Sequence, residues 1–286
     1  MFKRQTTGSV VCASCGYLVG VNDPTCYNCG RRYPGLWGFA PMLRSLGQDL
    51  GFVPFVIGLC AVLYVVGLVF SGGTAFGGGL FSFLSPSGFV LLILGASGQV
   101  PVFGLDRWWT VLSASWLHGG LLHILFNMLW VRQLAPAISE LYGPGRMVII
   151  YTVAGVAGFT LSSVAGATLA WLPIPFLQPG AITVGASAAV FGLLGAAVYY
   201  GRRTGSRAVG SQAWSYALPL FLFGFIMPGV DNYAHGGGFL GGYLAGLWLD
   251  PMKPERINHM LGAVICLALS LLSVIYSVVD YFVRLR

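Results

Sequence analysis

Seven apolar runs separated by short polar segments constrain this chain more than any other feature of its sequence. Only 8% of its residues are charged and 56% are hydrophobic, whereas soluble domains carry about 25% charged residues. The sequence therefore predicts an all-α polytopic membrane protein. Several runs are shorter than the ~20 residues that a lipid-exposed span needs, so we expect other helices to enclose them. The runs fall near 51–70, 121–138, 147–167, 184–200, 214–228, 234–249 and 260–283.

Lysine and arginine are distributed unevenly over the segments between these runs. With the N-terminus inside the cell, 12 of the 15 basic residues lie inside, and only Arg107, Arg284 and Arg286 lie outside. Because basic residues favour the cytoplasmic side, the sequence predicts a cytoplasmic N-terminus and an external C-terminus. This placement accounts for the net charge of +7, so we expect a lipid bilayer and no nucleic acid as partner. We expect the membrane to be a bacterial plasma membrane.

The stretch 80–117 is apolar but is interrupted by prolines and glycines. We expect a long structured loop there, with short helices lying at the membrane interface. Tryptophan side chains prefer the depth of the lipid headgroups, and we expect Trp108, Trp109 and Trp116 at that depth.

Three polar residues fall near the starts of the second, fourth and sixth runs. They are Asn127, Ser187 and His235. In the predicted topology these three helices all run inward from the outer face, so the three side chains reach a similar, shallow depth. Polar groups are costly in hydrocarbon unless they find partners, and we expect Ser187 and His235 to be each other's partners. Water from outside could reach such a site.

A serine hydroxyl needs an adjacent base to become a nucleophile, and His235 is the best-placed imidazole. Gly238, Gly242 and Gly246 on one helix, and small residues on the helix of Ser187, favour close helix contact. Small residues also pack ordinary helix bundles, and a serine in a membrane helix often bonds its own i−4 carbonyl. The pattern of small residues alone leaves both readings open.

A polar stripe begins the second helix. His123 and Asn127 are four residues apart and share a helix face, so both could donate hydrogen bonds to an oxyanion. The alternatives are structural bonding between helices or, for His118, snorkelling to the interface. Asp231 is expected to mark a helix start, where an acid favours the helix dipole; orienting His235 is the other role open to it.

These residues together resemble the rhomboid family of intramembrane serine proteases. The resemblance covers about 51–250 and implies a six-helix core, to which the last run adds a seventh transmembrane helix. It implies Ser187 as nucleophile, His235 as base, and an oxyanion hole made by the Ser187 amide with His123 and Asn127, without a catalytic cofactor. It implies substrates that are transmembrane segments with helix-breaking residues, cut near the outer face. The matching motifs are His118…His123…Asn127, Glu140-Leu141-Tyr142-Gly143, Gly185-Ala186-Ser187 and Ala234-His235 followed by glycines.

Two positions depart from the family pattern. Ala188 stands where the family usually has glycine, and Thr110 stands where an arginine often follows the paired aromatics. Arg107 could substitute for that arginine. The departures motivate an alternative function, a non-catalytic rhomboid-like protein that binds membrane clients. A third alternative, a proton-coupled transporter, is weakened because helices two to six contain no acidic residue within the membrane.

Four of the six cysteines lie in the N-terminal 30 residues. Cys12, Cys15, Cys26 and Cys29 form two C-x2-C pairs, and two such pairs supply the four thiolates of a tetrahedral zinc site. The alternative is two disulfides, which a reducing cytosol disfavours. We therefore predict a small zinc-ribbon-like head with a structural zinc ion, able to dock a protein partner. The expected divisions are the head 1–35, a linker 36–50, the six-helix catalytic core 51–250, and 251–286 with a linker and the seventh helix.

Overall fold

The computed structural model describes residues 4–45, 47–76, 83–169, 171, 179–227 and 229–285. Outside these ranges lie Lys3, which is one of the basic residues expected inside, and Arg286, which was expected outside. Residues 80–82 of the expected loop and residue 228 of the fifth apolar run also lie outside them. The side chain of Arg44 is likewise outside the description.

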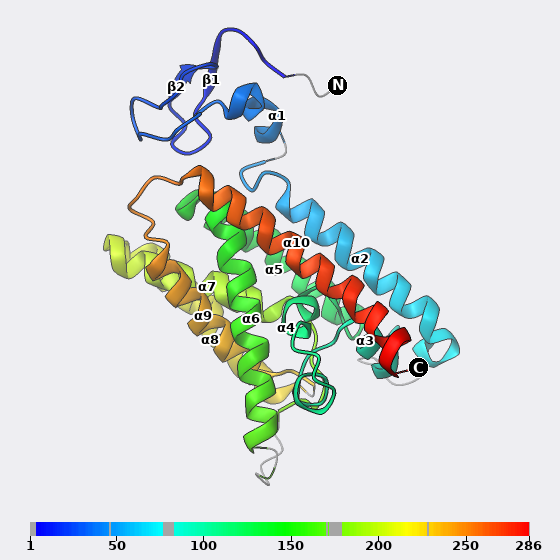
Figure 1. The fold of residues 1–286 in the computed structure, drawn as a ribbon. Coiled ribbons are helices and arrows are strands. Elements are labelled where there is room, and N and C mark those ends of the chain that lie inside the picture. Colours follow the sequence, from blue (N-terminus) through cyan, green and yellow to red (C-terminus); the bar gives the residue numbers. More distant parts are fainter. Residues whose placement is uncertain are drawn as a thin grey trace.

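Seven long helices make up most of the described chain, one for each apolar run (Figure 1). The predicted all-α polytopic fold is confirmed. The helix ends differ from the run ends by up to seven residues, because polar residues continue several helices beyond their apolar part. The helices are α2 (Phe52–Ser71), α5 (Leu121–Tyr142), α6 (Pro144–Leu169), α7 (Ser187–Thr204), α8 (Arg207–Ile226), α9 (Asn232–Trp248) and α10 (Ile257–Asp280).

Among the described residues, five helical segments are long and apolar enough to cross a membrane by themselves. They are α2, α5, α6, α8 and Ile257–Arg284. Helices α7 and α9 have only 18 and 17 residues, and other helices enclose them, as the short runs predicted. In α7, 12 of the 18 residues are buried, against 3 of the 20 in α8. An enclosed helix needs less length and hydropathy because it meets protein instead of lipid.

Glycines bring α6, α7 and α9 into close contact. A Cβ on Gly238 of α9 would collide with the carbonyl of Ala188 on α7, and one on Gly242 would collide with the carbonyl of Gly192. A Cβ on Gly158 of α6 would lie 2.5 Å from the carbonyl oxygen of Ala234. The close approach of the fourth and sixth helices, predicted from small residues, is confirmed. The third participant, α6, was not predicted.

The connection between α2 and α5 is a structured loop built from short helices, as predicted. Trp108 is exposed, but Trp116 is only 2% exposed and packs edge-on against Phe55. The indole of Trp116 therefore contacts protein side chains, and the headgroup depth expected for the three tryptophans stays a prediction. The short helices are η2 (Gly72–Phe76), α3 (Gly88–Leu94), η3 (Val100–Gly104), α4 (Thr110–Ser113) and η4 (Ala114–Trp116).

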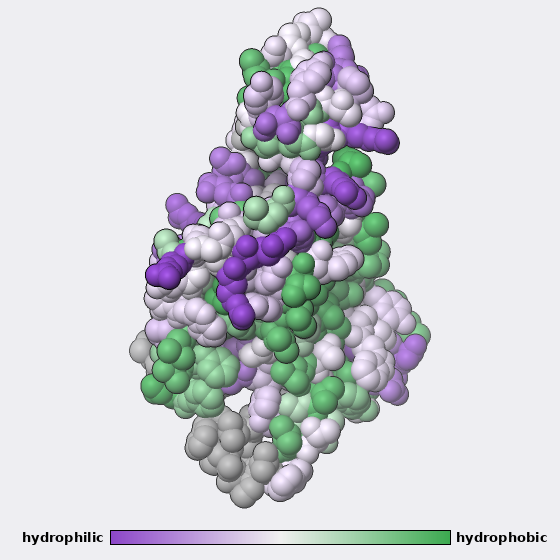
Figure 2. Space-filling model, turned by 90° about the vertical axis from the view of Figure 1, so that its left-hand side faces the viewer, coloured by the Kyte–Doolittle hydropathy of each residue, from purple (hydrophilic) through white to green (hydrophobic). Residues whose placement is uncertain are grey.

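The N-terminal head is a small unit beyond one end of the helices, and the C-terminus lies toward the other end (Figure 1). Strands β1 (Ser9–Val11) and β2 (Leu18–Gly20) pair antiparallel, with Val10 opposite Val19. The predicted linker contains two short helices, η1 (Leu36–Gly38) and α1 (Ala40–Arg44). Figure 2 shows hydrophobic residues over much of the helical part and a band of hydrophilic residues between it and the head.

Candidate functional site

The structure brings Ser187 and His235 into hydrogen-bond contact. Ser187 is the first residue of α7 and His235 is the fourth residue of α9. The distance between Ser187 Oγ and His235 Nε2 is 2.9 Å. The pair lies where the glycine contacts hold α7 and α9 together, so the backbone packing sets this distance. A hydroxyl bonded to an imidazole nitrogen can give up its proton during nucleophilic attack.

An aromatic ring orients His235. The ring of Phe191 stacks on the imidazole, with 4.3 Å between centroids and 21° between planes. The imidazole Nδ1 is buried and has no hydrogen-bond partner among the described residues. Asp231 serves the helix start instead, as predicted: its carboxylate accepts from the Ala234 amide at 3.0 Å and from the Ser162 hydroxyl.

His123 and Asn127 face the turn that leads into α7. A Cβ on Gly185 would lie 2.5 Å from His123 Nε2 and 3.8 Å from Asn127 Nδ2. His123 Nδ1 accepts a hydrogen bond from the Gly119 amide at 3.3 Å. The neutral ring therefore carries its proton on Nε2, where it can donate toward this turn. One N–H of Asn127 donates to the His123 carbonyl at 2.9 Å, and an amide group has a second N–H to offer.

The start of α7 adds backbone donors to the same place. Its N-cap residue, Ala186, makes no side-chain capping bond. The first N–H groups of a helix have no intrahelical partner, and the positive end of the helix dipole favours negative charge there. The amide of Ser187 is one of these groups. Backbone and side-chain donors thus flank the turn at Gly185, two residues before Ser187.

His118 lies beside this group and is buried. It is 1% exposed, and its ring packs edge-on against His123 with 5.2 Å between centroids. Both of its ring nitrogens lack a hydrogen-bond partner among the described residues. The alternative that His118 snorkels to the interface is wrong, because a snorkelling side chain reaches water.

Neighbouring groups accommodate both departures from the family pattern. The methyl group of Ala188 fits against Gly158 of α6, where a Cβ on the glycine would lie 2.7 Å from it. Thr110 is fully buried and donates its hydroxyl proton to the Arg107 carbonyl at 2.7 Å. Alanine at 188 is therefore compatible with the contact between α6 and α7.

Two side chains around the site were missed in the sequence: Phe191, which stacks on His235, and Ser162, which bonds Asp231 at the start of α9. Phe191 is four residues after Ser187, so it lies on the same helix face, and this spacing could have revealed it. Ser162 lies on α6, 69 residues before Asp231, and no local pattern indicates that contact.

The four head cysteines converge as a metal site requires. Their sulfur atoms all lie within 4.8 Å of one another; Cys12 and Cys29 are 3.8 Å apart, and Cys15 and Cys26 are 3.6 Å apart. Tetrahedral zinc with Zn–S bonds of about 2.3 Å places its sulfurs about 3.8 Å apart, whereas a disulfide needs about 2.05 Å. The donor set and its spacing fit one tetrahedral metal ion.

A buried ion pair ties the head to the helical core. Arg31 follows the last cysteine knuckle, and its Nη1 lies 3.5 Å from Glu255 Oε2. The other Glu255 oxygen accepts from the Arg146 amide at 3.0 Å, at the start of α6. Burial raises the pKa of the Glu255 carboxyl, and the Arg146 amide and the Arg31 charge oppose that rise. Gly143 is required here, since a Cβ would lie 2.6 Å from the Glu255 carboxyl carbon and the residue has φ +93°.

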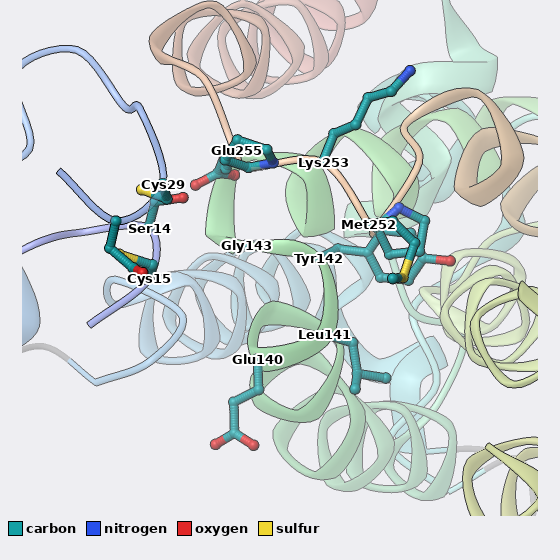
Figure 3. Close-up of a pocket in the computed structure, with 13 residues that line it drawn as sticks. Ser14, Cys15, Cys29, Glu140, Leu141, Tyr142, Gly143, Met252, Lys253 and Glu255 are labelled. Atoms are coloured by element: carbon teal, nitrogen blue, oxygen red, sulfur yellow. The ribbon is translucent and has the colours of Figure 1, made fainter. Parts of the chain in front are cut away.

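A cavity of about 470 Å³ lies between the head and the core. Figure 3 shows Cys15 and Cys29 on one side and the end of α5, with Glu140 and Tyr142, on the other. The loop that carries Glu255 closes a third side. The lining residues come from these three segments, so this cavity is separate from the Ser187–His235 pair.

Comparison with known proteins shows which family this chain resembles in sequence. Residues 105–252 match the family model described as Rhomboid domain. Rhomboid protease GluP of Bacillus subtilis (strain 168) is 33% identical over 168 residues, which cover 57% of this chain and 31% of that protein. RHOMBOID-like protein 7 of Arabidopsis thaliana is 33% identical over 171 residues, covering 58% of this chain and 50% of that protein.

Rhomboid-like protease 5 of Toxoplasma gondii is 33% identical over 172 residues, covering 58% of this chain and 19% of that protein. The matched region thus spans half or less of each of these three relatives.

Proposed function

This chain belongs to the rhomboid family, and we propose that it is an intramembrane serine endopeptidase that cuts transmembrane segments with a Ser187–His235 dyad. Five apolar helices and the family make it an integral membrane protein. The observation that carries the proposal is the 2.9 Å contact between Ser187 Oγ and His235 Nε2. The names of two relatives include the word protease, which supports the same activity.

The reaction begins when Ser187 Oγ attacks the scissile carbonyl and His235 Nε2 takes its proton. The Ser187 amide, His123 Nε2–H and the second N–H of Asn127 stabilise the negative charge on the carbonyl oxygen. His235 then gives the proton to the leaving amine, and an acyl ester remains on Ser187. A water molecule, deprotonated by His235, attacks the ester and releases the second product. The stacked ring of Phe191 holds the imidazole in place where other hydrolases use a carboxylate.

The orientation of the chain determines which side of the membrane is cut. We place the N-terminal head and the segments rich in arginine in the cytosol, and the C-terminus outside. Ser187 and His235 lie at the starts of α7 and α9, the ends opposite Arg202 and Arg203 of α7. This arrangement supports cleavage near the outer face, where water is available. The bacterial plasma membrane stays a prediction.

The direct test is cleavage of a fluorescent single-span substrate that carries a small residue and a glycine near its outer end. The purified wild-type protein is expected to cleave it in detergent and in liposomes. Ser187→Ala and His235→Ala are each expected to abolish cleavage. The thermal unfolding temperature of each variant is expected to stay within a few degrees of the wild-type value. Cleavage that survives Ser187→Ala would exclude this dyad.

The alternative is a non-catalytic protein that binds membrane clients, and Ala188 and Thr110 motivate it. The same preparation distinguishes the two functions. A client binder retains the uncleaved substrate with equal affinity in the wild type and in Ser187→Ala, whereas a protease releases two fragments only in the wild type.

The four head cysteines are proposed to hold one structural zinc ion. Their sulfur spacing supports it, and a head of this size has too little apolar core to be stable without a metal. Metal analysis of the full-length protein is expected to give one zinc per chain, and Cys26→Ser, at a buried ligand, is expected to lose it. A full-length protein that is folded and free of metal would refute the site.

A further inference from the structure

Arg107 connects the loop between α2 and α5 to the last helix. Its side chain is fully buried. Nη1 donates to the carbonyl of Leu92 in α3 at 2.6 Å, and Nη2 donates to the carbonyl of Ser277 in α10 at 2.7 Å. Its Nε lies 3.2 Å from Asp280 Oδ2. A buried cation is costly unless it is paired. The Arg107 guanidinium of the loop and the Asp280 carboxylate of α10 therefore neutralise each other.

Trp109 makes a second connection between the same two elements. Its indole N–H donates to Ser277 Oγ at 3.0 Å, and its ring packs edge-on against Tyr276 with 4.4 Å between centroids. Gly95 allows the close approach, since a Cβ there would lie 2.6 Å from Ser277 Oγ. The end of α10 and α3 lie beside each other in Figure 1.

The loop that contacts α10 also makes hydrogen bonds to the segment that leads to Ser187. Ser97 and Thr183 exchange two backbone hydrogen bonds, at 3.0 and 2.7 Å. The Gly185 amide donates to the Ala114 carbonyl at 3.0 Å. Gly185 is the residue that faces His123, two positions before Ser187. A continuous series of contacts therefore runs from α10 through the loop to the turn that presents the nucleophile.

We propose that α10 is a positioning element of the catalytic site, with Asp280 and Arg107 as its positioning residues. Asp280 fixes Arg107, Arg107 fixes the loop, and the loop fixes the turn 181–186 on which the position of Ser187 depends. This inference rests on the proposed function and gives the seventh helix a part in it. Neither residue touches the dyad, so both act through the backbone of residues 97–114 and 183–185.

The test compares Asp280→Asn with Arg284→Gln in the full-length protein. Arg284 pairs with the other Asp280 oxygen at 3.0 Å, but its side chain is 59% exposed, so its loss removes a partner of Asp280 without freeing Arg107. Two quantities are measured: backbone hydrogen exchange of residues 105–117 and 181–186, and kcat and KM on the single-span substrate. Asp280→Glu serves as the conservative variant.

Asp280→Asn is expected to speed exchange in both segments. Its kcat is expected to fall about tenfold to a hundredfold, because a small displacement of the reacting groups slows the chemical step. KM is expected to stay within about twofold of the wild type, because these contacts position the nucleophile and do not bind the substrate. Arg284→Gln is expected to behave as the wild type, and Asp280→Glu to recover part of kcat. If Asp280→Asn does not fold, Ser277→Ala takes its place. This variant removes the hydroxyl that accepts the Trp109 hydrogen bond, and it is likewise expected to speed exchange and to lower kcat.

Unchanged exchange at 181–186 overturns the inference, whether or not the protein cleaves. Faster exchange with an unchanged kcat overturns it as well, because the loop would then be tethered without effect on the reaction. A wild-type protein that cleaves no substrate overturns the proposed function instead, and the exchange comparison still decides whether α10 controls the turn.

Discussion

Gly185 occupies the most restricted position next to the proposed nucleophile. It has φ +128°, a backbone conformation that costs side-chain-bearing residues about 1–3 kcal/mol. Its missing side chain also leaves the space into which His123 Nε2 points. Gly185 is therefore needed for two reasons: its backbone conformation favours glycine, and its missing side chain leaves room for the His123 ring beside the turn.

Gly185→Ala is therefore expected to lower both stability and activity. The added methyl group would push His123 from the turn, so kcat is expected to fall about tenfold or more, equivalent to at least about 1.4 kcal/mol of barrier. Thermal unfolding and substrate kinetics measure the two effects. Gly58→Ala in α2, where a Cβ meets nothing within 4 Å, is the matched control and is expected to keep wild-type kinetics. Equal kinetics in both variants would contradict the role given to this turn.

At the level of residues, the sequence indicated Ser187, His235 and Asn127 through their similar expected depth and through the motifs that resemble the rhomboid family. The structure joins Ser187 to His235 by a hydrogen bond and places Asn127, in the second turn of α5, near Gly185. Spacing puts Phe191 on the same face of α7 as Ser187, but its stacking on His235 also depends on how α7 and α9 are rotated against each other, which hydropathy does not specify. The burial of His118 depends on the packing of the loop before α5, which no local pattern indicates.

Among the elements, the contact between α7 and α9 matters most for the proposed chemistry. Gly238 and Gly242 of α9 touch the backbone of α7, so the two helices are as close as their main chains permit. Ser187 and His235 lie one turn or less from this contact. The helix spacing therefore determines the distance between the hydroxyl and the imidazole.

Gly238→Ala and Gly236→Ala test this dependence on the same helix. The Gly238 methyl group would collide with the Ala188 carbonyl, which costs about 1–3 kcal/mol of strain and separates the dyad. The Gly236 methyl group would lie 3.9 Å from Phe221, and alanine favours a helix by about 1 kcal/mol over glycine. The thermal unfolding temperature and the cleavage rate are both expected to fall for Gly238→Ala and to stay at wild-type values for Gly236→Ala. The reverse order would show that the spacing of α7 and α9 does not control activity.

Helix number was predictable from the sequence, but helix ends were not. The fifth run was expected at 214–228, whereas α8 begins at Arg207. Hydropathy marks the part of a helix that meets lipid, and α8 continues through polar residues into water. Asp280, an acid within the last apolar run, was a visible signal that α10 has a partner inside the protein.

For the whole molecule, the head and the core are joined through one buried ion pair. Arg31 and Glu255 are 224 residues apart in the chain, and their side chains are 1% and 2% exposed. No local pattern in the sequence connects two residues at this separation. The zinc-ribbon-like segment was predictable from its cysteines, and its docking was not.

Glu255→Ala is expected to release the head from the core. Removal of one partner leaves Arg31 buried and unpaired, which costs about 3–5 kcal/mol. Limited proteolysis of the segment 38–50 measures the release. Arg203→Gln breaks the ion pair with Asp250, in which Arg203 is 49% exposed, and such pairs contribute about 0–1 kcal/mol, so this variant is expected to resist proteolysis as the wild type does.

Removal of zinc from the full-length protein is expected to have the same effect as Glu255→Ala, because Arg31 lies two residues after Cys29. Chelation of the wild type followed by the same proteolysis measures it. Protection of the segment 38–50 in both Glu255→Ala and the chelated protein would contradict the docking role of this ion pair.

Labelling by a fluorophosphonate tests whether His235 activates Ser187 as a nucleophile. The reagent reacts with activated serines, and mass spectrometry of the full-length protein locates the modified residue. We expect modification at Ser187 in the wild type and none in His235→Ala, although that variant stays folded. Modification at another serine, or undiminished modification of Ser187 in His235→Ala, would contradict this activation.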